Sequence, residues 1–289
     1  MIPKPFDYYA PASLDEAIRL LGENEEAKVL AGGQSLLPMM KLRLAAPAAL
    51  VDISRLPGLS YVREESDHLA VGALTTHDAI ERDPLIRKRF SIITDAVERI
   101  GDQQVRNLGT IGGSACHGDP ASDLPTALLA LDARFVLRGP TGERVVRAGD
   151  FFLDYFATAA QKDEILTELR LPFVPPRGGT AMVKHSLRAA DFPIAIVASV
   201  LTMGAGKTCI DARIAVGAAG PKPIRASSAE RYLKGSSLDE GTLALAAERA
   251  TDGAEPTSDV HGSREYRLAM IKVLTRRSLE LAVSRASVA

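Results

Sequence analysis

Two pairs of adjacent glycines, each following an apolar run, have the composition expected of anion-binding segments. The first pair lies in Lys28-Val-Leu-Ala-Gly-Gly-Gln-Ser-Leu-Leu-Pro38. The second lies in Asn107-Leu-Gly-Thr-Ile-Gly-Gly-Ser-Ala-Cys-His-Gly-Asp-Pro-Ala-Ser-Asp-Leu-Pro125. Glycine lets main-chain N–H groups turn inward and approach an anion closely, because no Cβ stands in the way. Two such segments on one chain could bind a diphosphate from both sides.

The elements around these pairs must place them near helix N-termini. Residues 27–31 predict a short buried strand and residues 36–44 a helix, so the first pair connects the two. Residues 120–131 predict a helix after the second pair. Helix N-termini favour negative charge. Either pair alone is equally compatible with a plain strand–turn–helix connection, and the G-x-G-x-x-G fingerprint of the Rossmann fold is absent.

Other chemically suggestive residues favour structural roles. Gly204–Thr208 lacks the first glycine of a P-loop, which is replaced by Leu201, and a hairpin turn is the better interpretation. His77 and His117 have no further ligands at a metal spacing, so we expect solvated or loop-packed histidines. Asp119 and Asp123 could form an acid–base pair. The interpretation that we prefer places Asp119 near a helix N-terminus, where the helix dipole favours it, and has Asp123 face a ligand hydroxyl. No catalytic and no metal-binding residue is predicted.

The overall composition excludes several classes of protein. The chain has 289 residues, 46% hydrophobic and 25% charged, and a formal net charge of -1, so no basic field favours nucleic acid. The two cysteines, Cys116 and Cys209, form no C-x-x-C pattern, which argues against a cysteine-ligated cluster or zinc site. A disulfide between them stays open, although so few cysteines favour a reducing compartment. With no signal-peptide pattern and no membrane-length apolar run, we expect a cytoplasmic location.

Local patterns predict an α+β fold in two domains. Ser13-Leu-Asp-Glu16 is a capping box that opens a helix. A cluster of proline and glycine over 172–179 predicts a boundary between a domain at 1–176, with subdomains at about 1–57 and 58–176, and a domain at 177–289. Strand-like runs in the second domain, at 180–186, 194–202 and 209–216, predict a three-stranded antiparallel sheet with helices on one side.

The two glycine segments resemble signature segments of a known family, the FAD-binding medium subunits of molybdenum hydroxylases such as carbon monoxide and xanthine dehydrogenases. Lys41-Leu-Arg43 and Leu50-Val-Asp-Ile53 extend the first block, and Val105 to Pro125 forms the second. Glu164-Ile-Leu166 and Lys184 to Phe192 match two later blocks. The resemblance implies a two-subdomain FAD-binding domain of the vanillyl-alcohol-oxidase type. A C-terminal domain of three-stranded antiparallel sheet plus helical bundle follows it.

The resemblance also implies which residues contact FAD. The first segment wraps the diphosphate, the second provides its other contact, and Asp123 bonds a flavin-side or ribose hydroxyl. Ile100 and Gly101 lie against the flavin, Lys184 lies close to the isoalloxazine, and Asp191 and Phe192 screen a flavin face. The complete expected set is Lys28, Val29, Leu30, Ala31, Gly32, Gly33, Gln34, Ser35, Leu36, Ile100, Gly101, Thr110, Gly112, Gly113, Ser114, Cys116, Asp123, Ile165, Leu166, Lys184, Asp191 and Phe192.

Three positions depart from the family pattern. Gln34 stands where His is frequent, Ser114 where Asn is frequent, and Phe192 where Tyr is frequent. Gln34 and Ser114 keep a hydrogen-bonding group, so FAD binding is still expected. A phenyl ring covers a flavin face but donates no O–H, so flavin potential and access are expected to be affected.

The implied function is electron transfer within a multi-subunit enzyme. Substrate would be oxidised at a molybdopterin centre on a large subunit, and electrons would pass through two [2Fe–2S] clusters on a small subunit to FAD on this chain and on to an external acceptor. A dimer of heterotrimers, a heterohexamer, is expected. Two alternatives are a stand-alone FAD-dependent oxidoreductase and a non-catalytic assembly protein that lost FAD. The four paired glycines argue against the second.

Overall fold

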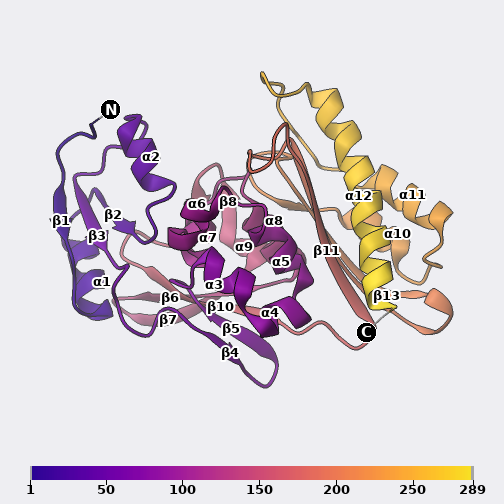
Figure 1. Cartoon of the computed structure of the whole chain (residues 1–289), viewed down its shortest axis with the longest axis horizontal. Helices are drawn as coiled ribbons and strands as arrows, with labels where there is room; N and C mark the ends of the chain where they lie inside the picture. Colours follow the sequence, from indigo (N-terminus) through magenta and orange to yellow (C-terminus); the bar gives the residue numbers. More distant parts are fainter. Residues whose placement is uncertain (1, 288–289) are drawn as a thin grey trace.

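The computed structural model describes residues 2–287, arranged as three regions in a row along the longest axis (Figure 1). The first region is a three-stranded parallel sheet with two helices. In it, β1 (Asp7–Tyr9) and β2 (Ala27–Leu30) both pair with the central β3 (Ala49–Asp52). Helices α1 (Leu14–Glu23) and α2 (Leu36–Lys41) follow β1 and β2.

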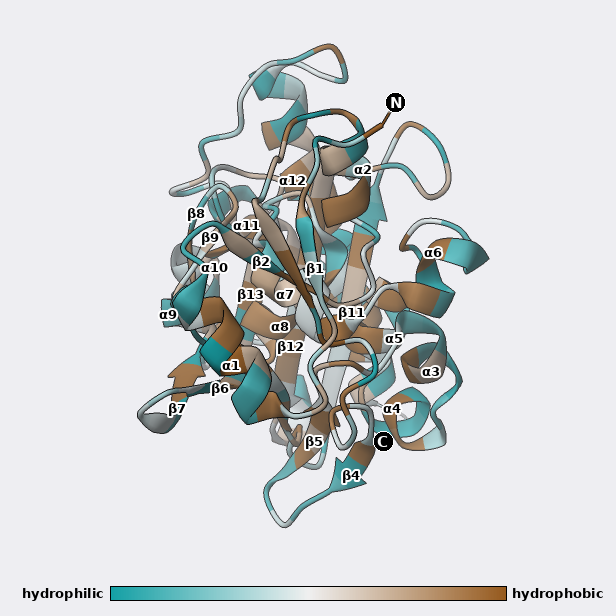
Figure 2. Ribbon diagram, turned by 90° about the vertical axis from the view of Figure 1, so that its left-hand side faces the viewer, coloured by the Kyte–Doolittle hydropathy of each residue, from teal (hydrophilic) through white to brown (hydrophobic). Residues whose placement is uncertain are grey.

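Helix α1 shows how the sequence specifies this region. Ser13 Oγ accepts the amide of Glu16, as the capping box predicts, whereas the Glu16 carboxylate accepts the amide of Ala12. Ala17, Ile18 and Leu21 form its buried face, and hydrophilic and hydrophobic segments alternate along the helix (Figure 2). This face packs on β3, because one side of a short parallel sheet needs an apolar cover.

The second region is a five-stranded antiparallel sheet covered by helices. Its strand order is β4-β5-β10-β6-β7. The strands are β4 (Val62–Glu64), β5 (His68–Gly72), β6 (Arg134–Gly139), β7 (Gly142–Arg147) and β10 (Ile165–Pro172). The helices are α3 (His77–Arg82), α4 (Pro84–Arg89), α5 (Ser91–Val97), α6 (Gln103–Leu108), α7 (Ile111–His117), α8 (Asp123–Ala130) and α9 (Ala148–Phe151), and a small hairpin is formed by β8 (Phe152–Asp154) and β9 (Ala157–Thr158).

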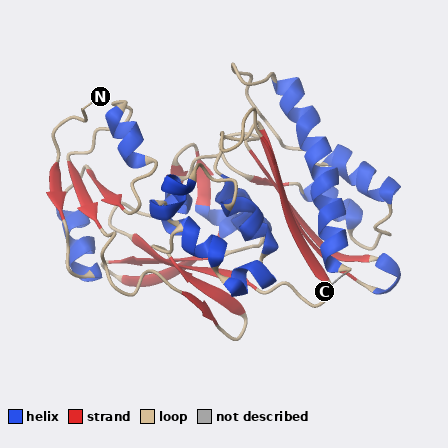
Figure 3. Cartoon of the chain, viewed as in Figure 1, coloured by secondary structure: helices blue, strands red, loops and turns tan. Residues whose placement is uncertain are grey.

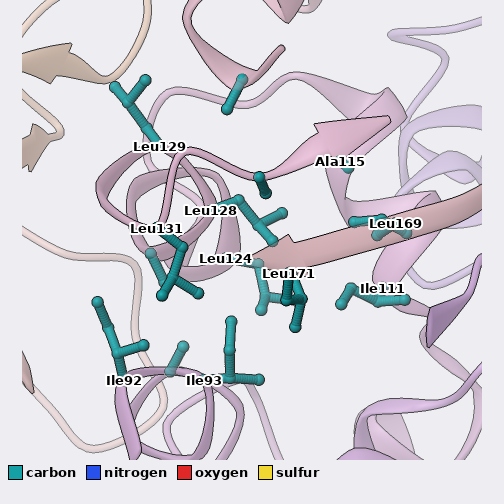
Figure 4. Close-up of a cluster of buried hydrophobic side chains, with 14 of the residues drawn as sticks. Ile92, Ile93, Ile111, Ala115, Leu124, Leu128, Leu129, Leu131, Leu169 and Leu171 are labelled. Atoms are coloured by element: carbon teal, nitrogen blue, oxygen red, sulfur yellow. The ribbon is translucent and has the colours of Figure 1, made fainter. Parts of the chain in front are cut away.

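Apolar side chains from these helices form the central core. Ile92, Ile111, Leu124 and Leu128 belong to one buried cluster with Leu169 of β10, and all five are completely buried (Figure 4). Helix α8 is buried along its whole length, since it lies between this core and the third region. The ends of α7 and α8 that hold the candidate site residues are therefore fixed by packing.

The third region is an antiparallel sheet of β11 (Gly178–His185), β12 (Ala195–Met203) and β13 (Cys209–Gly217), to which the two-residue β14 (Ile224–Arg225) adds a fourth strand. The short 3-10 helix Ala205–Lys207 connects β12 to β13, so the stretch Gly204–Thr208 is a hairpin connection, as predicted, and no P-loop. Helices α10 (Ser227–Leu233), α11 (Glu240–Arg249) and α12 (Arg264–Ala286) complete the region.

This C-terminal sheet is covered on both faces, although the sequence predicted helices on one side. Val197 and Leu201 belong to the apolar cluster under α10, α11 and α12. Ile196, Ala198 and Val200 point the other way and join the core formed by α5 and α8. Figure 3 shows helices on both sides of these strands. The core thus continues across residue 176, and a domain boundary there stays a prediction.

Candidate cofactor site

The two glycine segments contact each other directly. A Cβ placed on Gly32 would lie 1.9 Å from the Leu108 carbonyl oxygen and 2.8 Å from Gly109 Cα, and one placed on Gly113 would lie 3.8 Å from Ala31 Cβ. The backbones therefore pack without side chains between them. The two glycine segments can bind the same ligand, as the sequence predicts, only if they lie this close together.

The first segment has unused main-chain donors. Gly33 has φ +71°, a conformation that glycine adopts readily, and the Gln34 side-chain amide donates to the Gly32 carbonyl over 3.0 Å. Within residues 2–287, no atom accepts a hydrogen bond from the amides of residues 32–36. A run of free N–H groups before a short helix is the donor set that a diphosphate requires.

The second segment uses its amides within the protein, which differs from the inward-turned amides expected of both pairs. Gly112 donates to the Ala73 carbonyl over 2.9 Å, Gly113 to Thr110 Oγ1 over 3.1 Å, and Ser114 to the Thr110 carbonyl over 3.0 Å. The glycines lie in the first turn of α7 and not in an open loop. Because Thr110 Oγ1 accepts from Gly113, its own proton is left to donate. The hydroxyls of Thr110 and Ser114 are thus what this segment offers an anion.

Asp123, near the end of the second segment, forms a buried pair with Lys184 of β11. Lys184 Nζ lies 3.0 Å from Asp123 Oδ2 and also donates to the Arg99 carbonyl over 3.2 Å. The other carboxylate oxygen, Asp123 Oδ1, is buried and has no hydrogen-bond partner among the described residues. Burial raises the pKa of Asp123 to about 6, against the opposing effect of Lys184. A buried acceptor without a donor is costly, and a ligand hydroxyl would satisfy it.

Family models match nearly the whole chain. Residues 4–174 match the FAD binding domain in molybdopterin dehydrogenase, and residues 181–282 match the CO dehydrogenase flavoprotein C-terminal domain. The chain belongs to the family of FAD-binding medium chains of molybdenum hydroxylases. It is a flavoprotein subunit of a molybdenum-containing oxidoreductase, and the free amides of residues 32–36 together with Asp123 Oδ1 fit FAD.

Individual medium chains are similar over their full length. The carbon monoxide dehydrogenase medium chain of Hydrogenophaga pseudoflava is 38% identical over 99% of both chains. The 6-hydroxypseudooxynicotine dehydrogenase complex subunit alpha of Paenarthrobacter nicotinovorans is 38% identical over 99% of this chain and 97% of its own. A solved carbon monoxide dehydrogenase structure from Hydrogenophaga pseudoflava superposes with a TM-score of 0.96 at 40% identity, with 99% of both chains covered.

Other expected contacts of this medium chain lie around the same site. Ile100 and Gly101 precede α6, and their carbonyls accept from Arg106 Nη1 over 3.2 and 3.3 Å. Ile165 and Leu166 begin β10, where Ile165 packs in the core of the first region and Leu166 in that of the second. These two residues therefore lie where the two cores meet, close to the helices that bear the second segment.

Two expected contacts lie in an exposed loop. Asp191 and Phe192 belong to the connection between β11 and β12, and 70% of Phe192 is exposed. Among residues 2–287 no aromatic ring packs on that of Phe192, and its role as a flavin screen stays a prediction. Lys28 is likewise exposed, whereas Val29 and Leu30 are half-buried on β2. Cys116 is a free thiol in α7, and burial raises its pKa to about 12.

The histidines and Asp119 have structural surroundings. His77 is buried against Gly109, His117 packs on Phe156 with ring centroids 5.1 Å apart, and Asp119 accepts the amide of Ala121 in a turn before α8. Among residues 2–287, no three His, Cys, Asp or Glu side chains are grouped to hold a metal ion. Nor does any helix in that range have the length and apolarity needed to span a membrane.

Sequence reasoning missed Gly109 as a packing residue of the site. A Cβ there would lie 2.9 Å from His77 Cδ2. The signal was present, because Gly109 precedes Gly112 and Gly113 in a run of three glycines within five residues, but the partner that requires it lies on α3.

Proposed function

We propose that this medium chain binds FAD between its two glycine segments and conducts electrons from partner subunits to an external acceptor. FAD supplies the redox chemistry when it is bound. Electrons reach it from [2Fe–2S] clusters on a small subunit, after substrate oxidation at a molybdopterin centre on a large subunit. The assembly that we propose is a dimer of heterotrimers, a heterohexamer. The contact between the Gly32 and Gly109 backbones, beside the free amides of residues 32–36, carries this proposal.

The chain's own residues bind and orient the cofactor. The amides of residues 32–36 and the hydroxyls of Thr110 and Ser114 would hold the diphosphate. Asp123 Oδ1 would accept a hydroxyl of the ribose or ribityl portion, because this oxygen is buried without a donor. Lys184 keeps that carboxylate in place from the other side. None of these groups needs to act as an acid or base toward substrate.

The first test is FAD binding by the full chain. Gly113→Leu would drive a side chain toward Thr110 and Ala31, because even a Cβ at this position lies 2.8 Å from Thr110 Oγ1. We expect at least a hundredfold loss of FAD affinity, measured by titrating flavin-free protein and following flavin fluorescence. Gly22→Leu on α1 is the matched control, since a Cβ there meets nothing within 4 Å. Equal flavin content in both variants would contradict the proposal.

The second test separates a subunit from a stand-alone enzyme. The isolated chain loaded with FAD is expected to show no turnover of organic substrates with artificial electron acceptors. Addition of the small and large subunits should restore turnover. Turnover by the isolated chain would instead favour the stand-alone FAD-dependent oxidoreductase.

A further inference from the structure

A third segment, residues 73–77, is hydrogen-bonded along the second glycine segment. The amides of Ile111 and Gly112 donate to the carbonyls of Thr75 and Ala73 over 3.0 and 2.9 Å, and the amide of His77 donates to the Gly109 carbonyl over 2.9 Å. Thr76 and Thr110 form an antiparallel bridge between them. Residues 109–112 are therefore held by main-chain bonds to the segment that leads from β5 into α3.

The ring of His77 lies directly against Gly109. A Cβ at position 109 would meet His77 Cδ2 at 2.9 Å, His77 Nε2 at 3.1 Å and the Val105 carbonyl oxygen at 3.0 Å. Only 4% of His77 is exposed. Its Nδ1 has no hydrogen-bond partner among residues 2–287, so no bond at that atom holds the ring. Packing alone sets the ring's position and, with it, the limit to how far Gly109 can move toward α3.

Gly109 in turn limits the first glycine segment. The position of a Cβ on Gly32 lies 2.8 Å from Gly109 Cα and 1.9 Å from the Leu108 carbonyl oxygen. His77, Gly109 and Gly32 are thus in contact in series, with no side chain between the two glycines. A displacement of Gly109 would be transmitted to the segment that carries the free amides.

We propose that His77 is a positioning residue of the cofactor site, which acts through Gly109 to set the separation of the two glycine segments. This inference rests on the proposed function, because it assigns the separation to diphosphate binding. His77 itself makes no contact with FAD in this assignment. A Cβ at position 109 would push Gly109 away from His77 and against Gly32, and removal of the imidazole at position 77 would relieve that push.

The test is a double-mutant cycle on FAD affinity in the full chain. Gly109→Ala is expected to weaken FAD binding at least tenfold. Gly109→Ala combined with His77→Ala should recover most of that loss, because two of the three close contacts are with the imidazole. Gly112→Ala is the matched control: its three closest contacts are all atoms of Ala73, so adding His77→Ala should bring no recovery.

A second variant tests the same contact without changing a glycine. His77→Phe enlarges the ring against Gly109, and we expect it to weaken FAD binding at least threefold while far-ultraviolet circular dichroism shows a folded chain. Lack of recovery in the double variant, or unchanged FAD affinity in both Gly109→Ala and His77→Phe, would overturn the assignment. An unaltered chain that takes up no FAD would contradict the proposed function itself, and the assignment with it.

Discussion

Lys184 Nζ lies 3.0 Å from Asp123 Oδ2, and this ion pair joins strand β11 of the C-terminal sheet to the first turn of helix α8. Both side chains are more than nine-tenths buried. Removal of charge from water is costly, so such a pair stabilises the chain only when its geometry and hydrogen bonds are good. Here Lys184 also donates to the Arg99 carbonyl, whereas Asp123 Oδ1 is left without a donor among the described residues. Among the described residues, Lys184 therefore has two acceptors, whereas one oxygen of the Asp123 carboxylate has no donor.

Asp123→Asn is expected to remove a pH-dependent loss of stability. The pKa of this carboxyl is about 6 in the folded chain, against an ordinary value of 3.8. The stability that the protonated carboxyl contributes is therefore fully present below about pH 4 and is lost as the pH rises through about 6. Two pKa units correspond to about 3 kcal/mol. Urea unfolding of flavin-free chains should show the variant gaining about 2–3 kcal/mol on the wild type between pH 4 and pH 7.5. A constant difference over that range would contradict the burial effect.

Lys184→Met is expected to destabilise the chain strongly near neutral pH. The substitution leaves the Asp123 carboxylate buried without its cation, which costs about 3–5 kcal/mol. The loss should be smaller at pH 5, where the carboxyl can take up a proton. Lys88→Met serves as control, since Lys88 is exposed on α4 and should change the free energy of unfolding by less than about 0.5 kcal/mol. Equal losses for the two variants would argue against the pair.

Gly179→Ala should weaken the attachment of α12 to the C-terminal sheet. A Cβ at this position lies 1.9 Å from the Ala282 carbonyl oxygen and 2.7 Å from the Ala286 amide nitrogen. Both are main-chain atoms within α12, so no side chain can rotate away. We expect the free energy of unfolding to fall by about 1–3 kcal/mol. Gly149→Ala is the control, because a Cβ there meets nothing within 4 Å. Urea unfolding of the two variants measures the difference, and equal free energies of unfolding would show that the helix moves freely.

The two cysteine thiols are expected to be free and slow to react. Burial raises the pKa of Cys116 to about 12 and that of Cys209 to about 11. Since the thiolate is the reactive form, roughly one thiol in a thousand or fewer is ionised at pH 8. A disulfide-exchange colour reagent should modify both cysteines quickly in guanidinium and neither quickly in the native chain. Absence of thiols after unfolding would reveal a disulfide, and fast native reaction would contradict the burial.

Local patterns were enough to predict several of the strands. The strand-like runs predicted at 27–31, 180–186, 194–202 and 209–216 correspond to β2, β11, β12 and β13. Helices α4 and α6 were not predicted, because α4 buries only Ile86 and α6 buries no residue, so neither shows an apolar period. Their start signals were in the sequence: Asp83 before a proline and Asp102 both cap a helix with their carboxylates.

The site depends on contacts that no local pattern contains. The approach of Gly32 to Gly109 and the pairing of Asp123 with Lys184 join residues far apart in sequence. The family resemblance assigned Asp123 and Lys184 to one cofactor site, but it predicted neither their ion pair nor the approach of Gly32 to Gly109. The prediction that the amides of the second segment are free for an anion was wrong. These amides donate within the protein, partly to residues 73–77, and the glycine motif contains no information about that neighbouring segment.

The sheet of β11 to β14 has consequences for how such a chain can change over generations. Because α5 and α8 cover one of its faces and α12 the other, a gene truncated after residue 176 would encode a chain with a bare apolar core face. A chain that loses or exchanges its C-terminal third is therefore expected to aggregate, whatever the effect on electron transfer. The exposed connection between β11 and β12 covers no such face, so a change there would leave the core closed.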